Sequence, residues 1–367
     1  MSATPSVKST FWAKSLFFTL MQRFSLFFFG LGSFFILTHN FLTKEEVGIY
    51  ALFQTTLGLL EYLKMGLLRN ALIKLKFDEG YINRSDEVYS ASLIINFAYS
   101  AVVIVFLLFF SGWISSLLKT PELKDLLHLS IGIVIFQIPF SHCEILQQSV
   151  MTYQKTFYAY CIRQGLVFAF IASALFNRSI VINNNSLVIA QIVAIGTASV
   201  YYLFVSGRML SRKLEVNMHL IWKLLQFGRY VFGTALLSYL YKFADHFVTA
   251  YVIGDPFRGK IYVSYYNVVS RVSNVLDVPF MAVADVLFPK NAHALATEGT
   301  TKVKYYFERM VGILTALIIP VSICICFLPG FVIRLIAGPA YLPAVPILQI
   351  TMAFAFLRPF YGQFGFT

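Results

Sequence analysis

The chain has 367 residues, of which 58% are hydrophobic and 13% are charged, and its mean hydropathy is +0.72. A soluble domain is about half apolar and a quarter charged. The excess of apolar surface, which includes 38 Phe, excludes a water-soluble globular protein and indicates a chain built for a lipid bilayer. The net charge of +12 is ascribed mainly to the loops between the predicted spans, so we expect no nucleic-acid partner.

Apolar runs of about 20 residues predict an all-α, polytopic membrane protein with about ten transmembrane helices. The first run lacks a cleavage site of small residues, so we expect a retained helix rather than a signal peptide. The loops are short and leave no extramembrane domain to carry chemistry. In chain order, the predicted spans are 16–38, 47–68, 90–112, 127–150, 157–176, 187–207, 224–252, 261–288, 308–328 and 342–362.

Lys and Arg are distributed unequally between alternate loops. If the N-terminus is cytoplasmic, the inner segments hold most of these residues, with Lys155 and Arg163 counted among them. An excess of Lys and Arg in short loops marks the cytoplasmic side of a membrane. We therefore expect a multi-pass protein with its N-terminus in the cytoplasm.

Two parts of the chain resemble each other. The stretch around Trp12, FWAKSLFFTLMQRFSLFFFG, and the stretch from Trp222, WKLLQFGRYVFGTALLSYLY, each begin a long span with an arginine near its cytoplasmic end. Each span is followed by a short outer loop and an aromatic helix start, GIYALF at Gly48–Phe53 and KIYVSYY at Lys260–Tyr266. The two arginines are Arg23 and Arg229. Transporters are often built from such repeats, with substrate bound between the halves.

This repeat predicts the domain organisation. We expect an N-terminal six-helix bundle over 1–210 and a C-terminal bundle over 211–367 with four helices, which together form two inverted-V helix bundles with the second incomplete. The chain is then expected to be a fragment that lacks about two or more helices of the repeat. The alternative is a natural ten-helix protein.

Two arginines lie inside predicted spans. Arg23 is about seven residues into its span, roughly 10 Å deep, where it either snorkels to the inner interface or faces a cavity. Arg271 is about ten residues into the 261–288 span, where snorkelling is hard, so a structural ion pair or a cavity role is expected and the cavity is favoured. The candidate substrate-binding residues are Arg23, Gln22, Arg271, Asn267, Asn274 and Tyr266.

Acidic residues inside spans pose a choice between ion coupling and structural pairing. Asp245 follows Lys242 by three residues, so it either takes H⁺ or Na⁺ during coupling or pairs with Lys242. Asp277 poses the same choice on the next helix. Both are candidate coupling residues, and no other cofactor and no metal are expected because the His and Cys residues lack metal-ligand spacing.

Other polar residues inside spans are weighed in the same way. For Glu61 and Lys64 on the second span, a structural pair is the favoured interpretation. His142 and Glu144 follow Pro139 in the fourth span and are candidates for lining a cavity, although a packing role is the more common one for such residues.

Several motifs together resemble the Wzx-type oligosaccharide flippases, within the superfamily that includes the MATE multidrug extruders. In LTKEEVGIYALFQTTLGLLEYLKMGLLRNALIKL (Leu42–Leu75), an acidic loop precedes a Gly-Xaa-Tyr helix start at Gly48–Tyr50, and a Gly-Leu turn precedes a basic loop. FGRYVFGTALLSYLYKFADHFVTAYVIG (Phe227–Gly254) is similar to the family's seventh helix with its Asp, here Asp245. Tyr265–Gly299 looks like the eighth helix, so the resemblance covers most of 10–300.

The resemblance implies a fold of two helix bundles around a cavity and a flippase of the bacterial inner membrane. Its cargo would be an undecaprenyl-diphosphate-linked oligosaccharide for surface polysaccharide such as lipopolysaccharide O-antigen, moved by alternating access. The expected partners are this lipid-linked oligosaccharide, membrane lipids and other polysaccharide assembly proteins. Arg23 and Arg271 would offset the diphosphate charge, because Arg stays protonated at depth and binds phosphate bidentately.

Two alternatives remain open. The first is a multidrug/cation antiporter of the same fold, which a cavity dominated by acids would favour. The second, from a different class, is a membrane-embedded polysaccharide polymerase or ligase, which needs a clustered nucleophile, acid or base, often on a large outer loop. The sequence has no GxSxG motif and no long outer segment, so we expect no enzymatic activity.

Overall fold

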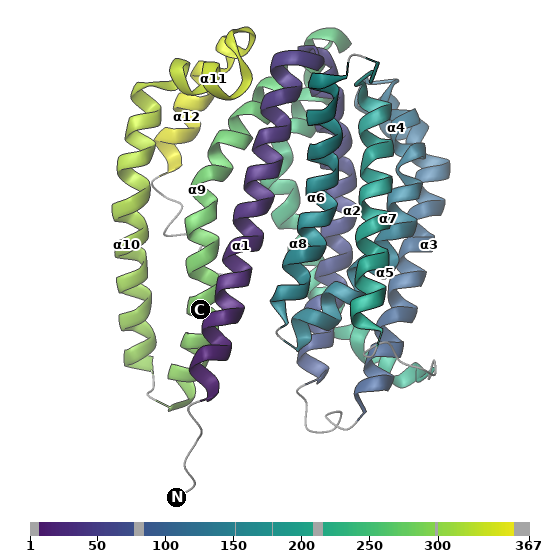
Figure 1. The fold of residues 1–367 in the computed structure, drawn as a ribbon, viewed down its shortest axis with the longest axis vertical. Coiled ribbons are helices and arrows are strands. Elements are labelled where there is room, and N and C mark those ends of the chain that lie inside the picture. The colour runs from purple at the N-terminus through teal and green to yellow at the C-terminus, as the bar shows by residue number, and fades with distance from the viewer. Residues whose placement is uncertain are drawn as a thin grey trace, which may run out of the picture. The chain divides into compact units, whose positions relative to one another are not determined.

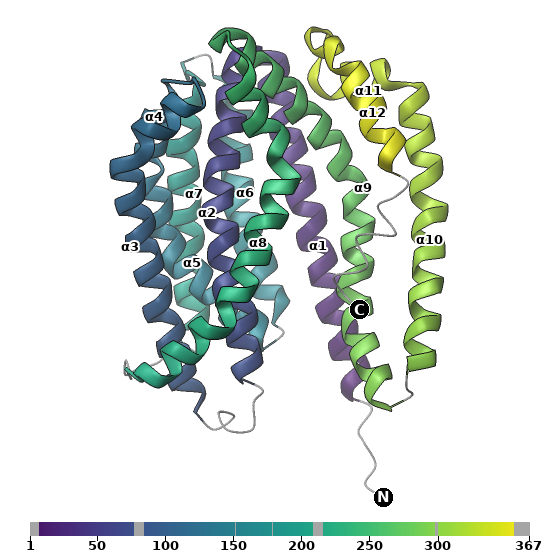
Figure 2. The same cartoon turned by 180° about the vertical axis from the view of Figure 1, so that it is seen from behind.

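The computed structural model describes residues 7–76, 84–150, 152–177, 179–207, 216–297 and 300–355. These residues form helices and no strand, which confirms the all-α prediction (Figures 1 and 2). The helices are α1 (Val7–Ile36), the π-helical η1 (Leu37–Phe41), α2 (Lys44–Lys76), α3 (Ser85–Leu117), α4 (Leu123–Leu129), α5 (Ile131–Ser149), α6 (Tyr153–Phe176), α7 (Asn184–Ser206), α8 (Met218–Val252), α9 (Pro256–Thr297), α10 (Thr300–Phe327), α11 (Pro329–Ala337), the 3₁₀-helix η2 (Pro339–Ala344) and α12 (Val345–Ala355).

Every predicted span falls on a helix, and the departures lie at breaks and ends. The span predicted at 127–150 is α4 and α5, which bend by 40° around Ser130. The span predicted at 342–362 begins inside η2, whose two prolines disfavour an α-helical start, and continues into α12, while its last part, 356–362, lies outside the described residues. Helix α11 lies in a segment predicted to be a loop.

Five of the described helices are long and apolar enough to cross a membrane, or six if the bent pair α4 and α5 counts as one span. The long helices outside this set, α2, α8 and α9, carry charged residues within them, such as Glu61, Asp245 and Arg271, which lower their mean hydropathy. A helix that is apolar on all sides can face lipid. A helix that carries charged residues needs protein or water on the side where they lie.

Helix starts follow local sequence signals. At α2, Thr43 and Glu46 form a reciprocal cap, in which Glu46 Oε2 accepts from the Thr43 backbone N at 2.8 Å and Thr43 Oγ1 accepts from the Glu46 backbone N at 3.3 Å. Asn183 and Ser186 form the same capping box at α7, and Asn217 caps α8. Such caps satisfy backbone donors that have no partner within the helix, so each of these helices has a fixed starting residue.

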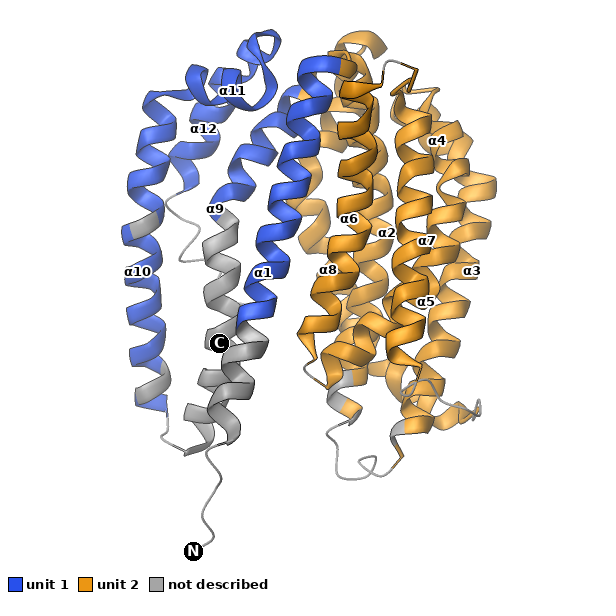
Figure 3. Ribbon diagram, in the orientation of Figure 1, with its two compact units in different colours: residues 1–40, 265–367 blue, residues 41–264 orange. Residues whose placement is uncertain are grey.

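The chain packs as two compact units (Figure 3). Unit 1 comprises residues 1–40 and 265–367, and unit 2 comprises residues 41–264. The boundary between 264 and 265 lies within α9, and the boundary between 40 and 41 lies within the π-helical η1. The bundles predicted over 1–210 and 211–367 are based on the sequence repeat. The two compact units are based on contacts between residues, so the predicted bundles stay a prediction.

Unit 2 is a bundle in which α2 packs most extensively against α8, and α5 and α6 pack on α7. Glycines allow the α2–α8 approach. A Cβ added at Gly66 would lie 2.9 Å from Ala235 Cβ, and one added at Gly228 would lie 2.4 Å from the Leu67 carbonyl oxygen. The helix that opens the second sequence repeat is therefore seated directly on the second helix of the first.

Helix α5 is the polar centre of unit 2. Pro139 lacks the backbone N–H that the carbonyl four residues earlier would otherwise accept, which loosens this turn of the helix. Side chains of three neighbouring helices donate to the next three carbonyls, those of Phe136, Gln137 and Ile138, respectively. The donors are Ser199 Oγ from α7 (2.8 Å), Lys64 Nζ from α2 (3.5 Å) and Asn96 Nδ2 from α3 (3.0 Å).

Candidate functional site

In unit 1, the Arg271 side chain of α9 lies against α1. Its guanidinium carbon is 5.3 Å from the centre of the Phe34 ring, and its Nε donates to Asn267 Oδ1 at 3.3 Å. Gly30 of α1 faces the guanidinium, since a Cβ added at this position would lie in ordinary van der Waals contact with Arg271 Nη1 at 3.8 Å. Stacking on an aromatic face and one amide contact orient the planar fork, the group that binds phosphate oxygens in pairs.

The face of α1 that meets Arg271 also carries Arg23. Residues 23, 30 and 34 lie within about 40° of one another around the helix axis, because seven residues complete nearly two turns. Arg23 and Gln22 are both half-buried. Phe34 contacts Arg271 and Gly30 faces it, and Arg23 lies about 10 Å from Gly30 along the same face toward the N-terminus.

The candidates on α9 divide between two faces. Asn267, Arg271 and Asn274 lie within about 60° of one another, whereas Tyr266 is rotated by about 100° from Asn267. Asn267 is buried, and Asn274 and Tyr266 are half-buried. The side chain of Asp277 lies outside the described residues, so its coupling role stays a prediction.

Asp245 lies in a bent part of α8 in unit 2. Its Oδ1 is 2.8 Å from His246 Nδ1 and accepts from the His246 backbone N at 2.9 Å. The Asp245 side chain is half-buried and His246 is buried. Phe243, two residues earlier, has non-helical torsions (φ −120°, ψ 16°), which marks a kink at this level of the helix. The residue therefore has a buried imidazole as a neighbour, which sequence reasoning did not pair with it.

Unit 2 also holds an ion pair inside the bundle that sequence reasoning missed. Arg163 on α6 lies 3.5 Å from Glu61 Oε1 on α2 through its Nη2, with side-chain exposures of 20% and 26%. The guanidinium carbon lies 5.3 Å from the centre of the buried Phe140 ring. Arg163 lies inside α6, where a carboxylate and an aromatic face replace part of its hydration, and its assignment to a cytoplasmic segment stays a prediction.

A second carboxylate is buried next to this pair. Glu144 on α5 accepts hydrogen bonds at Oε1 from Tyr160 Oη at 2.9 Å and from Gln148 Nε2 at 3.0 Å. Lys64, which was expected to pair with Glu61, is buried and donates to the Gln137 carbonyl, while Glu61 forms its ion pair with Arg163. The acids Glu61 and Glu144 lie close to the bases Lys64 and Arg163. Their charges can cancel, and charged side chains can be buried when they are paired in this way.

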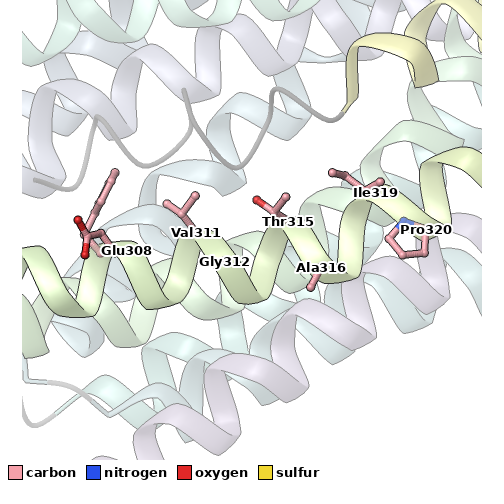
Figure 4. Close-up of a pocket in the computed structure, with 8 residues that line it drawn as sticks. Glu308, Val311, Gly312, Thr315, Ala316, Ile319 and Pro320 are labelled. Carbon is pink, nitrogen blue, oxygen red and sulfur yellow. The ribbon is translucent and has the colours of Figure 1, made fainter.

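An open cavity of about 650 Å³ runs along one side of α10 in unit 1 (Figure 4). Val311, Thr315 and Ile319 project from this side, with Glu308 near one end and Pro320 near the other. Among the described residues, the lining is apolar apart from Glu308 and Thr315 and contains no cation. Such a lining suits an apolar group better than an anionic one.

The comparisons with known proteins agree on the fold. A solved inward-facing multidrug resistance MATE family transporter of the MOP superfamily superposes with a TM-score of 0.69 at 13% identity, over 91% of this chain and 81% of that one. An outward-facing MATE transporter gives 0.69 at 14% identity, over 95% and 79%. The fold is that of the MATE transporters, and the chain is a multi-pass membrane protein.

The sequence comparison assigns the chain more narrowly than the fold comparison does. The family described as polysaccharide biosynthesis protein matches residues 39–346. The chain belongs to this family, as the resemblance to Wzx-type flippases led us to expect. An uncharacterized membrane protein of Methanocaldococcus jannaschii is 28% identical over 159 residues, which are 42% of this chain and 29% of that protein. The chain therefore matches less than a third of the length of this curated relative.

Proposed function

We propose that this protein flips a lipid-linked oligosaccharide, carried on undecaprenyl diphosphate, across the bacterial inner membrane by alternating access during surface polysaccharide synthesis. The family supports a role in polysaccharide biosynthesis, and the MATE fold is one on which alternating access is built. The cargo must bring a diphosphate and polar sugars through a low-dielectric slab, so it needs a counter-charge and hydrogen-bonding groups inside the fold.

The observation that carries the proposal is the setting of Arg271. A central arginine costs about 2.5–3.5 kcal/mol on insertion scales, so its presence calls for a function or a fixed partner. Its described contacts in unit 1 include the Phe34 ring and the Asn267 amide, which hold the planar fork in one orientation. A fork held in this way presents paired donors to phosphate oxygens, and a diphosphate would match its charge.

The remaining groups of unit 1 suit the other parts of the cargo. Asn267, Asn274 and Tyr266 bring amides and a phenol to the helix that carries Arg271, and such groups hydrogen-bond sugar hydroxyls. The apolar cavity on α10 would accept part of a prenyl chain.

Asp245 and Asp277 are the proposed sites for coupling to H⁺ or Na⁺, and Asp245 has His246 beside it as a proton partner.

The multidrug/cation antiporter is the second candidate, and the names of the solved relatives favour it. A cationic drug would be repelled by Arg271, because two like charges in a low-dielectric site disfavour each other. The polymerase or ligase class requires a nucleophile with an adjacent base, and we propose no such role for any described residue.

Reconstituted vesicles test the proposal. The purified protein is placed in liposomes containing a fluorescent undecaprenyl-diphosphate oligosaccharide, and an impermeant quencher or glycosidase reports the leaflet of the lipid. The proposal expects protein-dependent movement between the leaflets and no extrusion of a cationic dye from matched vesicles. Dye extrusion without movement of the lipid would transfer the assignment to the antiporter.

A further inference from the structure

Lys260 is a buried amine shared by two carboxylates. Its side chain is 6% exposed, and its Nζ lies 2.8 Å from Glu122 Oε1 and 3.0 Å from Glu45 Oε1. The three residues come from three separate segments of unit 2: the first turn of α2, the residue before α4 and the second turn of α9. We call Lys260, Glu45 and Glu122 the ion triad.

The helices joined by the ion triad touch through their backbones. A Cβ added at Gly48 of α2 would lie 1.9 Å from the Lys260 carbonyl oxygen, so no side chain fits between α2 and α9 at this level. Gly48 and Lys260 also begin the corresponding aromatic helix starts of the sequence repeat, GIYALF and KIYVSYY. The contact thus joins equivalent positions of the two repeats.

Beneath the ion triad lies apolar core. Ile49 of α2 and Val263 of α9 are 5% and 0% exposed and belong to one buried cluster. Water reaches the triad from its outer side, since the Glu45 and Glu122 side chains are 31% and 51% exposed. The triad is therefore the outermost layer of the seam between α2 and α9, at the end of the fold that the topology prediction places outside the cytoplasm.

We propose that the ion triad is a lock that holds the extracytoplasmic ends of α2 and α9 together and releases when that end of the fold opens. The lock rests on the proposed function, because alternating access requires repeat-related helices to separate at one end in part of the cycle. It assigns to Lys260 a role in the conformational cycle, separate from the cargo contacts of Arg271.

The chemistry of the triad suits a reversible lock. Partly exposed ion pairs are individually weak, so separating the helices costs little once water re-solvates the carboxylates. One amine serves two acids, so the contact with Glu45 can break before the contact with Glu122. At Gly48 no interdigitated side chain has to be withdrawn. A permanent clamp would instead be built from interlocked apolar side chains.

The same segment supplies a matched control. Arg258, two residues before Lys260, also forms an ion pair, with Asp255 at 3.5 Å, but its side chain is 75% exposed and its partner lies on its own helix turn. Loss of Arg258 removes one positive charge from this end of the protein without touching α2. An effect of Lys260 that Arg258 does not share therefore belongs to the contact between helices.

The test measures access to the seam beneath the lock. In a background with the native cysteines replaced, Val263→Cys is labelled with a membrane-impermeant maleimide on cells whose outer face is accessible, and Phe257→Cys, 55% exposed, reports which side this end faces. Lys260→Met should raise the labelling rate at position 263 about tenfold, equivalent to about 1.4 kcal/mol. Lys260→Arg and Arg258→Met should leave it unchanged.

Glu122→Gln serves as a second variant with a smaller expected increase, should Lys260→Met fail to insert. Equal labelling of Val263→Cys in all variants would overturn the lock, and so would labelling of Phe257→Cys only after permeabilisation. Cross-linking Glu45→Cys to Lys260→Cys should stop transport, and full transport with the cross-link in place would also overturn it. Lock-dependent labelling in a protein that moves no lipid would refute the proposed function and leave the lock intact.

Discussion

At the residue scale, charged side chains in this fold are kept inside helices by specific partners. Arg163 stacks on Phe140 and pairs with Glu61, and Glu144 receives hydrogen bonds from Tyr160 and a glutamine. Arg271 lies against the Phe34 ring and donates to the Asn267 amide oxygen. The contacts of Arg163 and Glu144 serve the packing of unit 2, whereas the charge of Arg271 is proposed to meet the cargo.

The ion pair inside unit 2 gives a prediction about stability. Arg163→Met should lower the free energy of unfolding by about 1–3 kcal/mol, because Glu61 is left as a poorly hydrated carboxylate. Adding Glu61→Gln should restore part of the loss by removing that charge. Thermal melting of the detergent-purified variants measures both effects. A double variant that is no more stable than Arg163→Met would show that the pair does not act as a unit.

Substitution of Arg271 predicts a functional defect with a preserved fold. Arg271→Ala should abolish transport, and Arg271→Lys should lose much of it, because an ammonium group lacks the planar fork that binds phosphate in pairs. Vesicle transport and protein yield in the membrane are measured together. Arg309→Ala is the control in the same unit, since Arg309 is exposed and bonded to Tyr305. Equal transport by Arg271→Ala and the control would remove Arg271 from the mechanism.

The sequence could identify the unusual residues but not their partners. Depth within an apolar run singled out Arg271, and helical periodicity put Asn267 and Asn274 beside it. Phe34 could not be found in this way, because the contact joins segments far apart in the chain. Arg163 was counted with the cytoplasmic segments although it falls within the span predicted at 157–176, and only the packing of α6 on the bundle brings it to Glu61.

At the element scale, the close approach of helices depends on glycines, and this is testable. Gly48→Ala should destabilise the fold and weaken the ion triad, since its Cβ would overlap the Lys260 carbonyl and force α2 and α9 apart. Gly233→Ala on α8 meets nothing within 4 Å and should be neutral or stabilising by up to about 1 kcal/mol, because Ala favours helix. Melting temperatures that fall equally in both variants would contradict this.

The ion triad also predicts an acid-dependent stability. Burial raises the pKa of Glu122, but the hydrogen bond and charge of Lys260 lower it more, so the pKa lies below its ordinary value of 4.5. A depressed carboxyl pKa stabilises the fold above 4.5, and the stabilisation is lost as pH falls through the folded-state pKa. Burial lowers the pKa of Lys260, but its carboxylate partners raise it above 10.5 overall, so the amine stays charged throughout this range.

Melting temperatures at neutral pH and below pH 4.5 measure this effect. Lys260→Met should show a smaller loss of stability on acidification than the unsubstituted protein, because Glu122 then has no cation to hold its pKa down. Arg258→Met should keep the full acid dependence. Parallel curves for all three proteins would mean that the triad does not contribute to folding.

The positions of the long helices could be predicted from the sequence, but the breaks within helices could be predicted only in part. Apolar runs located every long helix, and TKEE at Thr43–Glu46 fixed the start of α2 through its cap. The break at Ser130 between α4 and α5 lies two residues before Gly132, and the sequence analysis predicted one continuous span through it. Helix α11 was missed because nine residues are too few to register as a span.

At the scale of the whole molecule, the repeat and the packing divide the chain differently. The repeat separates α2 from α8, yet these helices pack together along unit 2, and the ion triad joins α2 to the start of α9. In a transporter built from repeats, contacts between repeat-related helices are the ones that change during the cycle. The α2–α8 and α2–α9 seams are therefore where we expect conformational change to be controlled.

The most direct test of the account is the leaflet that holds the lipid-linked oligosaccharide in cells that lack this protein. Spheroplasts of a deletion strain, complemented with the unsubstituted protein or with Arg271→Lys, are probed with an impermeant lectin or glycosidase. We predict that the lipid accumulates in the cytoplasmic leaflet in the deletion strain and in Arg271→Lys, with surface polysaccharide lost. Accumulation in the periplasmic leaflet would mean that flipping proceeds without this protein and would contradict the account.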